Sequence, residues 1–169
     1  YSFDSGPVKI VDLAQGENIP ENVIRALQDP NVIKTAYNAA FEWYCLNKFY
    51  HAPLEQFRCT MFHGLYCGYT AGLGQTAIAL GLPQDKRKVT TGNTLIKLFC
   101  TPTKPSNKNG QRTRTLPHHE PEKWELFKDY GVQDVEVEKA IYHKLINFPI
   151  PADEQKLWQI DQMINVKGV

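Results

Sequence analysis

A β-branched and aromatic run that passes directly into a helical run is the feature that most constrains this fold. Residues 32–37 read Val-Ile-Lys-Thr-Ala-Tyr, a composition that predicts an inner strand. Asn38 follows, a residue that bonds local backbone where a chain turns, and residues 40–50 then continue as an amphipathic helix. The sequence therefore predicts a strand-to-helix junction at Asn38.

The segments before this junction predict further strand and helix. Residues 1–13 predict two short strands around a turn at Ser5-Gly6-Pro7. Pro20 opens a helix that Asp29-Pro30 ends. The order strand, strand, helix, strand, helix is typical of an α/β protein with a mixed sheet and helices packed on its faces.

The second half of the chain is mainly helical by the same criteria. A short segment around residues 57–60 precedes helices expected at 61–69, 74–81, 91–100, from Pro121 onward, and at about 153–166. Between them, residues 101–121 contain four prolines with many Lys, Asn, Thr and Arg residues, which predicts a long exposed loop.

Composition is that of an ordinary soluble domain. The 169 residues are 42% hydrophobic and 22% charged, and no apolar run is long enough to cross a bilayer. The four cysteines have no metal-type spacing and lie among apolar neighbours, so we expect reduced, buried thiols and a cytoplasmic location.

Positive charge is concentrated in one segment. Residues 86–119 hold eight basic and no acidic residues, whereas the rest of the chain has eleven basic and eighteen acidic residues. Such a segment suits contact with a phosphate backbone, although a solvated loop rich in lysine is the alternative. The basic residues are Lys86, Arg87, Lys88, Lys97, Lys104, Lys108, Arg112 and Arg114.

Tyr130 and Asp134 lie four residues apart in the long helix, so both point to one face. A carboxylate there can hold a divalent metal, and the phenol can orient a metal-bound water. Glu42, just after the strand-to-helix junction, offers a second carboxylate. Each residue also has a purely structural alternative. Asp134 would be a surface acid, Tyr130 an aromatic at the edge of the core, and Glu42 a first-turn acid that complements the helix dipole.

These motifs together resemble a known family. Asn38-Ala39-Ala40-Phe41-Glu42 with Tyr130-x-x-x-Asp134 resembles the 3′–5′ exonucleases of the RNase H-like (DEDD) superfamily. Residues 58–61, 95–102 and 124–135 are similar to the exonuclease region of phage-type family A DNA polymerases, and residues 154–168 to its passage into the polymerase domain. The resemblance implies a partial exonuclease domain at 1–148, the start of a connection at 149–169, and an RNase H-like sheet.

The resemblance also implies a chemistry, the proofreading hydrolysis of DNA 3′ ends with two Mg²⁺ or Mn²⁺ ions. Asp134 and Glu42 would be metal ligands, Tyr130 would orient the attacking water, and Asn38 would support the turn or approach the substrate. The implied partners are DNA and the polymerase domain of the same parent chain. We expect the loop to contact DNA through Lys104, Lys108, Arg112 and Arg114.

The chain departs from the family at one motif. The family's first motif, Asp-x-Glu on the first strand, is absent from the opening residues, where Asp4 and Asp12 are the candidate substitutes. We therefore expect a sheet without its first strand, an isolated chain that is inactive, and sheet edges open to self-association. The alternatives are a non-catalytic RNase H-like module that binds DNA or acts as a scaffold in a polymerase, and a related exoribonuclease.

Overall fold

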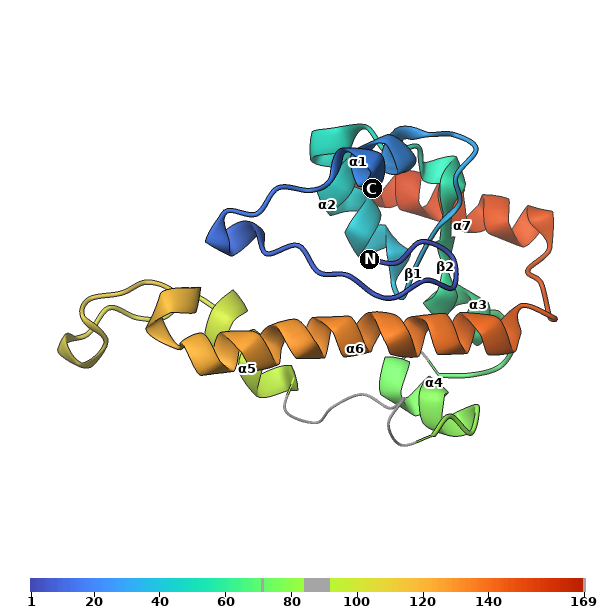
Figure 1. The fold of residues 1–169 in the computed structure, drawn as a ribbon. Helices are drawn as coiled ribbons and strands as arrows, with labels where there is room; N and C mark the ends of the chain where they lie inside the picture. Colours follow the sequence, from blue (N-terminus) through green and yellow to red (C-terminus); the bar gives the residue numbers. More distant parts are fainter. Residues whose placement is uncertain (71, 84–91, 169) are drawn as a thin grey trace. The chain divides into compact units, whose positions relative to one another are not determined.

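The structure, a computed structural model, describes residues 1–70, 72–83 and 92–168 (Figure 1). The chain forms two compact units. Unit 1 comprises Tyr1–Asn18 and Lys88–Glu136, and unit 2 comprises Ile19–Arg87 and Val137–Val169. Helix α6, Pro121–Leu145, is unbroken and supplies residues to both units.

Unit 2 is built on a strand-helix-strand motif. Strands β1 and β2 are parallel, with Lys34 opposite Phe57 and Ala36 opposite Cys59, and helix α2 connects them (Figure 1). A helical crossover of this kind is the usual connection between parallel strands. The elements are α1 (Glu21–Gln28), β1 (Lys34–Ala36), α2 (Ala39–Tyr50), β2 (Phe57–Cys59), α3 (Thr60–Tyr66), α4 (Leu73–Ala79), the end of α6, and α7 (Ala152–Lys167).

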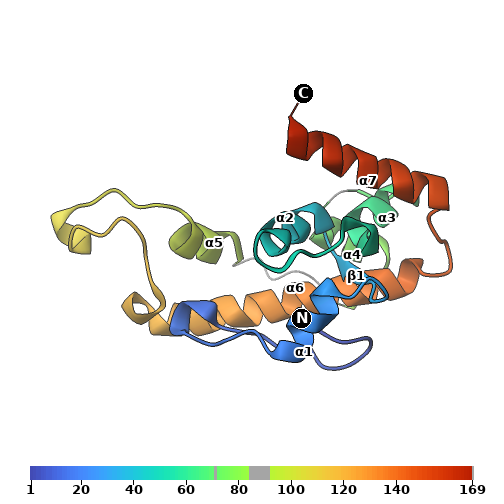
Figure 2. The same ribbon diagram turned by 90° about the horizontal axis from the view of Figure 1, so that it is seen from above.

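One face of this small sheet carries the first core of unit 2. Phe57 and Cys59 are almost fully buried and pack with Trp43 of α2 and Trp158 of α7. The indole Nε1 of Trp43 donates to the carbonyl of Ala52 at 3.0 Å, so the buried ring leaves no donor unpaired. Helix α7 therefore belongs to the packing of unit 2 (Figure 2).

The second core of unit 2 lies along the end of α6. Val137, Ile141 and Leu145 follow each other at helical spacing and are almost completely buried against Ala77 and Leu82.

Unit 1 packs α5 (Gly92–Cys100) on the first half of α6. Its core contains Leu95, Phe99 and Tyr130, with Trp124 and Phe127 packed against them. The long loop between these helices extends beyond their ends (Figures 1 and 2) and contains the 3-10 helices Asn107–Asn109 and Pro117–His119.

The predicted helices are confirmed within a few residues, and the mixed α/β class is confirmed in its coarse form. The predicted strands within residues 1–13 are wrong, because this segment forms a turn and ends in a 3-10 helix, Leu13–Gln15. Tyr1 and Lys9 exchange one pair of hydrogen bonds, but Pro7 lacks an N–H and Asp4 has a positive φ of 48°. Among the described residues, the sheet is a two-stranded parallel one, whereas a larger mixed sheet was expected.

The cysteines differ partly from expectation. All four are free thiols, as predicted, but only Cys59 is buried, while Cys45 and Cys100 are exposed. Within the described part of the chain, none of the helices has the length and apolar character required to cross a membrane.

Candidate functional site

Tyr130 and Asp134 occupy successive turns of α6, as predicted, and both belong to unit 1. The ring of Tyr130 is 6% exposed and stacks on Phe127 at 6.3 Å between centroids with an interplanar angle of 8°. Gly92 is another neighbour of this ring, and a Cβ atom there would overlap it. The absence of a side chain at Gly92 thus creates the space for this ring, and Asp134 follows one turn later as a partly buried residue.

Glu42 and Asn38 lie at the start of α2 in unit 2. Asn38 is the N-cap residue, exposed and in the left-handed conformation at φ 65° and ψ 49°, a region that asparagine tolerates better than most residues. Glu42 is in the first turn, where its charge complements the positive end of the helix. Its Oε2 atom is buried and has no hydrogen-bond partner among the described residues.

The structure adds a carboxylate that the sequence reasoning missed, Glu138. It is 6% exposed, and its Oε1 accepts a 2.5 Å hydrogen bond from the hydroxyl of Thr60, the first residue of α3. The hydroxyl of Thr35 in β1 also bonds to this carboxyl group. One signal could have found it, because Glu138 follows Asp134 by one helical turn on the same face of α6.

The carboxyl group of Glu138 affects Glu42 electrostatically. Burial raises the pKa of Glu42, and the carboxyl group of Glu138 raises it further. A hydrogen bond from the Glu42 backbone lowers this pKa, but by less than burial raises it. Burial also raises the pKa of Glu138, although the hydroxyls of Thr60 and Thr35, His143 and Lys139 act in the opposite direction. Positive charge added beside Glu42 would stabilise its ionised form, which burial and the carboxyl group of Glu138 disfavour.

The residues of the predicted metal site fall in different units. Tyr130 and Asp134 lie in unit 1 and Glu42 in unit 2, so their joint role stays a prediction. Within residues 1–70, 72–83 and 92–168, no three His, Cys, Asp or Glu side chains are grouped as metal ligands would be.

The basic loop of unit 1 is ordered by hydrogen bonds around one side chain, Asn109. Its Nδ2 donates to the carbonyls of Lys104 and Arg112 at 2.9 and 3.3 Å, and its Oδ1 accepts from the backbone of Ser106 and Arg112. Among the described residues, the exposed Lys104, Lys108 and Arg114 have no carboxylate partner. Lys86, Arg87 and Lys88 lie outside the described residues.

The two candidate substitutes for the first motif, Asp12 and Asp4, differ in burial. Asp12 is 5% exposed and accepts from the indole Nε1 of Trp124 and the side chain of Gln15, each at 2.6 Å. Burial alone would raise the pKa of Asp12, but the bonds from Trp124 and Gln15 and the charge of Lys128 lower it below its ordinary value. Asp4 is exposed in a turn.

Comparison with known proteins relates the chain to a polymerase. It is 49% identical over 171 aligned residues, covering all of this chain, to a DNA polymerase of Bacillus phage SP02. The chain spans about a quarter of that relative, 26% of its length. No family model and no solved structure matches the chain. The chain is thus related in sequence to part of a phage DNA polymerase.

Proposed function

We propose that this chain is the 3′–5′ exonuclease portion of a phage-type DNA polymerase. The observation that carries the proposal is the 49% identity, over the whole chain, to part of a phage DNA polymerase. The positions of the motif residues support it, with Asn38 and Glu42 at the start of α2 and Tyr130 and Asp134 on successive turns of α6. The reaction is phosphodiester hydrolysis at a DNA 3′ end.

Glu42 fits the role of a ligand for a divalent cation. Its Oε2 is buried without a hydrogen-bond donor, and the neighbouring Glu138 adds a second carboxyl group. The family resemblance gives Asp134 the same role, as a ligand of Mg²⁺ or Mn²⁺, which prefer oxygen ligands. Bound there, the ions would stabilise charge on the attacking and leaving oxygens. An intact site would take two ions, and this chain, without the first motif, has too few carboxylates for both.

Tyr130 would contribute orientation. Its ring is held between Gly92 and the stacked Phe127, so the phenol direction is fixed by the core of unit 1. Asp134 follows one turn along the same face. A phenol held in this way can position a water molecule for attack.

The rest of the polymerase would cover one face of α7. Leu157, Ile160 and Ile164 form a stripe at helical spacing and are 58%, 45% and 45% exposed. Adjacent apolar side chains of this kind suit contact with another domain. We therefore propose that residues 149–169 begin the connection to the polymerase domain of the same parent, which acts in the cytoplasm of the infected cell.

The test of catalysis uses the full-length parent polymerase. Asp134→Ala is expected to abolish release of nucleotides from a 3′-labelled strand while leaving polymerisation intact. Asp153→Ala, which removes an exposed acid of α7, is the matched control and should leave both activities unchanged. Unaltered proofreading in the Asp134 variant would exclude the proposed role.

A second measurement concerns the chain by itself. With Mg²⁺ and a 3′-labelled single strand, the 169-residue chain is expected to give no shortened products, because two carboxylates are lacking. Rapid degradation would show that the residues present are sufficient.

The second candidate function is a non-catalytic DNA-binding module of a polymerase. The ordered basic loop favours it, since Lys104, Lys108 and Arg114 are exposed without carboxylate partners among the described residues. A parent polymerase that binds single strands through this loop but never shortens them would support the module and exclude the exonuclease.

A further inference from the structure

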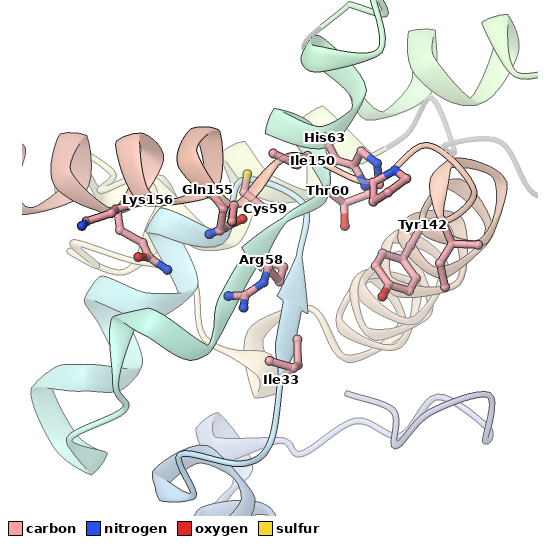
Figure 3. A pocket seen from close by; sticks show the side chains of 13 residues that line it. Ile33, Arg58, Cys59, Thr60, His63, Tyr142, Ile150, Gln155 and Lys156 are labelled. Atoms are coloured by element: carbon pink, nitrogen blue, oxygen red, sulfur yellow. The ribbon is translucent and has the colours of Figure 1, made fainter.

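Unit 2 contains a pocket of about 630 Å³ whose lining includes none of the predicted catalytic, metal-binding or DNA-binding residues. It lies between β2 and the start of α3, the end of α6, and the first turn of α7 (Figure 3). Its size is within the range of roughly 300–1,000 Å³ that small-molecule sites occupy. Glu42, Tyr130 and Asp134 do not line it, so it is separate from the proposed exonuclease site.

The charge of the pocket lining is positive. One arginine, Arg58, and one lysine, Lys156, line the pocket, and no described Asp or Glu lines it. Arg58 Nη1 donates to the carbonyls of Glu55 and Phe57 at 2.7 and 2.9 Å, which fixes the guanidinium and leaves its other N–H groups for a ligand. Neither cation forms an ion pair with any described residue. Two cations without an ion-pair partner among the described residues, in a lining that contains no acidic side chain, favour an anion.

The first turn of α7 adds partial positive charge to the same place. Ala152, Gln155 and Lys156 line the pocket, and the N-cap residue Pro151 provides no side-chain bond to this turn. The first N–H groups of a helix have no acceptor within the helix, so they attract anions such as phosphate. Asp153 and Glu154 belong to this turn as well, but they do not line the pocket.

The pocket lining includes the buried side-chain amide of Gln155, which has an acceptor atom without a donor in the described part of the chain. Gln155 is 9% exposed, and its Nε2 donates to the carbonyl of Phe57 at 3.2 Å. Its Oε1 is buried and has no partner among the described residues. A buried acceptor left unpaired is unfavourable, and a ligand N–H group would satisfy it.

The remaining lining is apolar and includes one aromatic ring. Ile33, Ile146 and Ile150 border the pocket together with Tyr142, and Figure 3 shows Arg58 between Ile33 and the Gln155–Cys59 region. A flat ring fits beside Tyr142 and the isoleucines, since aromatic side chains provide stacking surfaces for bases.

We propose that this pocket binds a nucleoside monophosphate group. The phosphate is bound by Arg58, Lys156 and the first turn of α7, the base lies against Tyr142, and a base N–H donates to Gln155. The same chemical group occurs in a free nucleotide and at a 5′-phosphorylated DNA end.

The test is isothermal titration of the 169-residue chain with dAMP, inorganic phosphate, deoxyadenosine and a short 5′-phosphorylated oligonucleotide. Saturable binding of dAMP is expected, with weaker binding of phosphate and of deoxyadenosine. Arg58→Gln and Lys156→Gln should each weaken dAMP binding about tenfold, because each removes a charge-assisted contact. Lys144→Gln, an exposed charge deletion on α6 outside the pocket, is the matched control and should bind normally.

Each outcome decides the proposal. Absence of dAMP binding at millimolar concentration, or equal affinity in all three variants, would overturn it. Phosphate bound as tightly as dAMP would overturn the role of Tyr142 and Gln155. Tighter binding of the phosphorylated oligonucleotide would identify a strand end as the source, and tighter binding of dAMP would identify the free nucleotide. The unfolding midpoint of each variant, measured by circular dichroism, separates lost binding from lost folding.

Discussion

Asp12 in unit 1 and Glu138 in unit 2 are almost equally buried carboxylates whose pKa values shift in opposite directions. They are 5% and 6% exposed. The pKa of Asp12 is lowered and the pKa of Glu138 is raised. Burial acts in the same sense on both groups, so the difference comes from their hydrogen-bond donors and neighbouring charges.

The donors differ in number and in charge. Asp12 accepts from Trp124 and from both the backbone and the side chain of Gln15, with Lys128 at 3.8 Å. Glu138 has the hydroxyls of Thr60 and Thr35, and its neighbour Glu42 is another acid. Asp12 is therefore a stabilising anchor for the N-terminal segment, whereas the two hydroxyls, His143 and Lys139 do not offset the effect of burial on the pKa of Glu138.

Removal of the anchor is expected to have the largest effect. Asp12→Ala should lower the free energy of unfolding by about 3 kcal/mol, because the Trp124 indole and the Gln15 groups lose a charged acceptor. Denaturant unfolding followed by tryptophan fluorescence measures it. Asp4→Ala is the matched control, since Asp4 is exposed, and it should change stability little. Equal effects in the two variants would remove the distinction between the two acids.

Loss of a donor to Glu138 is expected to have the next largest effect. Thr60→Val keeps the shape of the side chain but removes the hydroxyl that donates to Glu138, which should destabilise the fold by about 2 kcal/mol. Thr60→Ser, which retains the hydroxyl, should restore most of this. If the valine variant is as stable as the native chain and the serine variant is not, packing of the Thr60 methyl group, and not its hydroxyl, stabilises the fold.

Acid should remove the stability that the charged Asp12 contributes. Because the folded pKa of Asp12 is lowered, its contribution is present above the unfolded value near 3.8 and is lost as pH falls through the folded pKa. The stability difference between the native chain and Asp12→Asn should therefore stay constant at neutral pH and shrink only as the pH falls through 3.8 toward the lower folded pKa. A difference independent of pH would show that the Asp12 charge does not contribute.

The smallest effect is expected from neutralising Glu138. Glu138→Gln keeps an acceptor for Thr60, removes a charge next to Glu42 and should stabilise the fold by about 1 kcal/mol at neutral pH. Thermal unfolding measures it, with Glu136→Gln on the partly buried side of the same helix for comparison. A loss of stability would show that unit 2 needs the charge of Glu138.

The helices of this chain were predictable because their signals are local. Pro121 and Pro20 mark helix starts, and the apolar spacing of α6 indicates its buried faces. The anchor was not predictable, since Asp12 and Trp124 are 112 residues apart in sequence. The failure at residues 1–13 has a related cause, because an alternating pattern does not specify whether a partner strand exists.

The candidate site was predictable in part. The placement of Glu42, Tyr130 and Asp134 on helices follows from sequence spacing, but the burial of Tyr130 depends on the missing side chain of Gly92, a contact across the core of unit 1. Glu138 carried a spacing signal, yet its environment depends on Thr60 and Thr35 from distant segments.

The Asn109-centred loop changes the thermodynamics expected for a basic segment. A disordered lysine-rich tail must lose conformational entropy when it binds a strand, which weakens each contact. Here four hydrogen bonds between the side-chain amide of Asn109 and backbone groups already fix the chain between Lys104 and Arg112. Its cations thus form a preset array. If the loop binds single strands as proposed, counterion release should drive most of that binding, with log affinity falling by about 0.7 per phosphate neutralised for each unit of log salt.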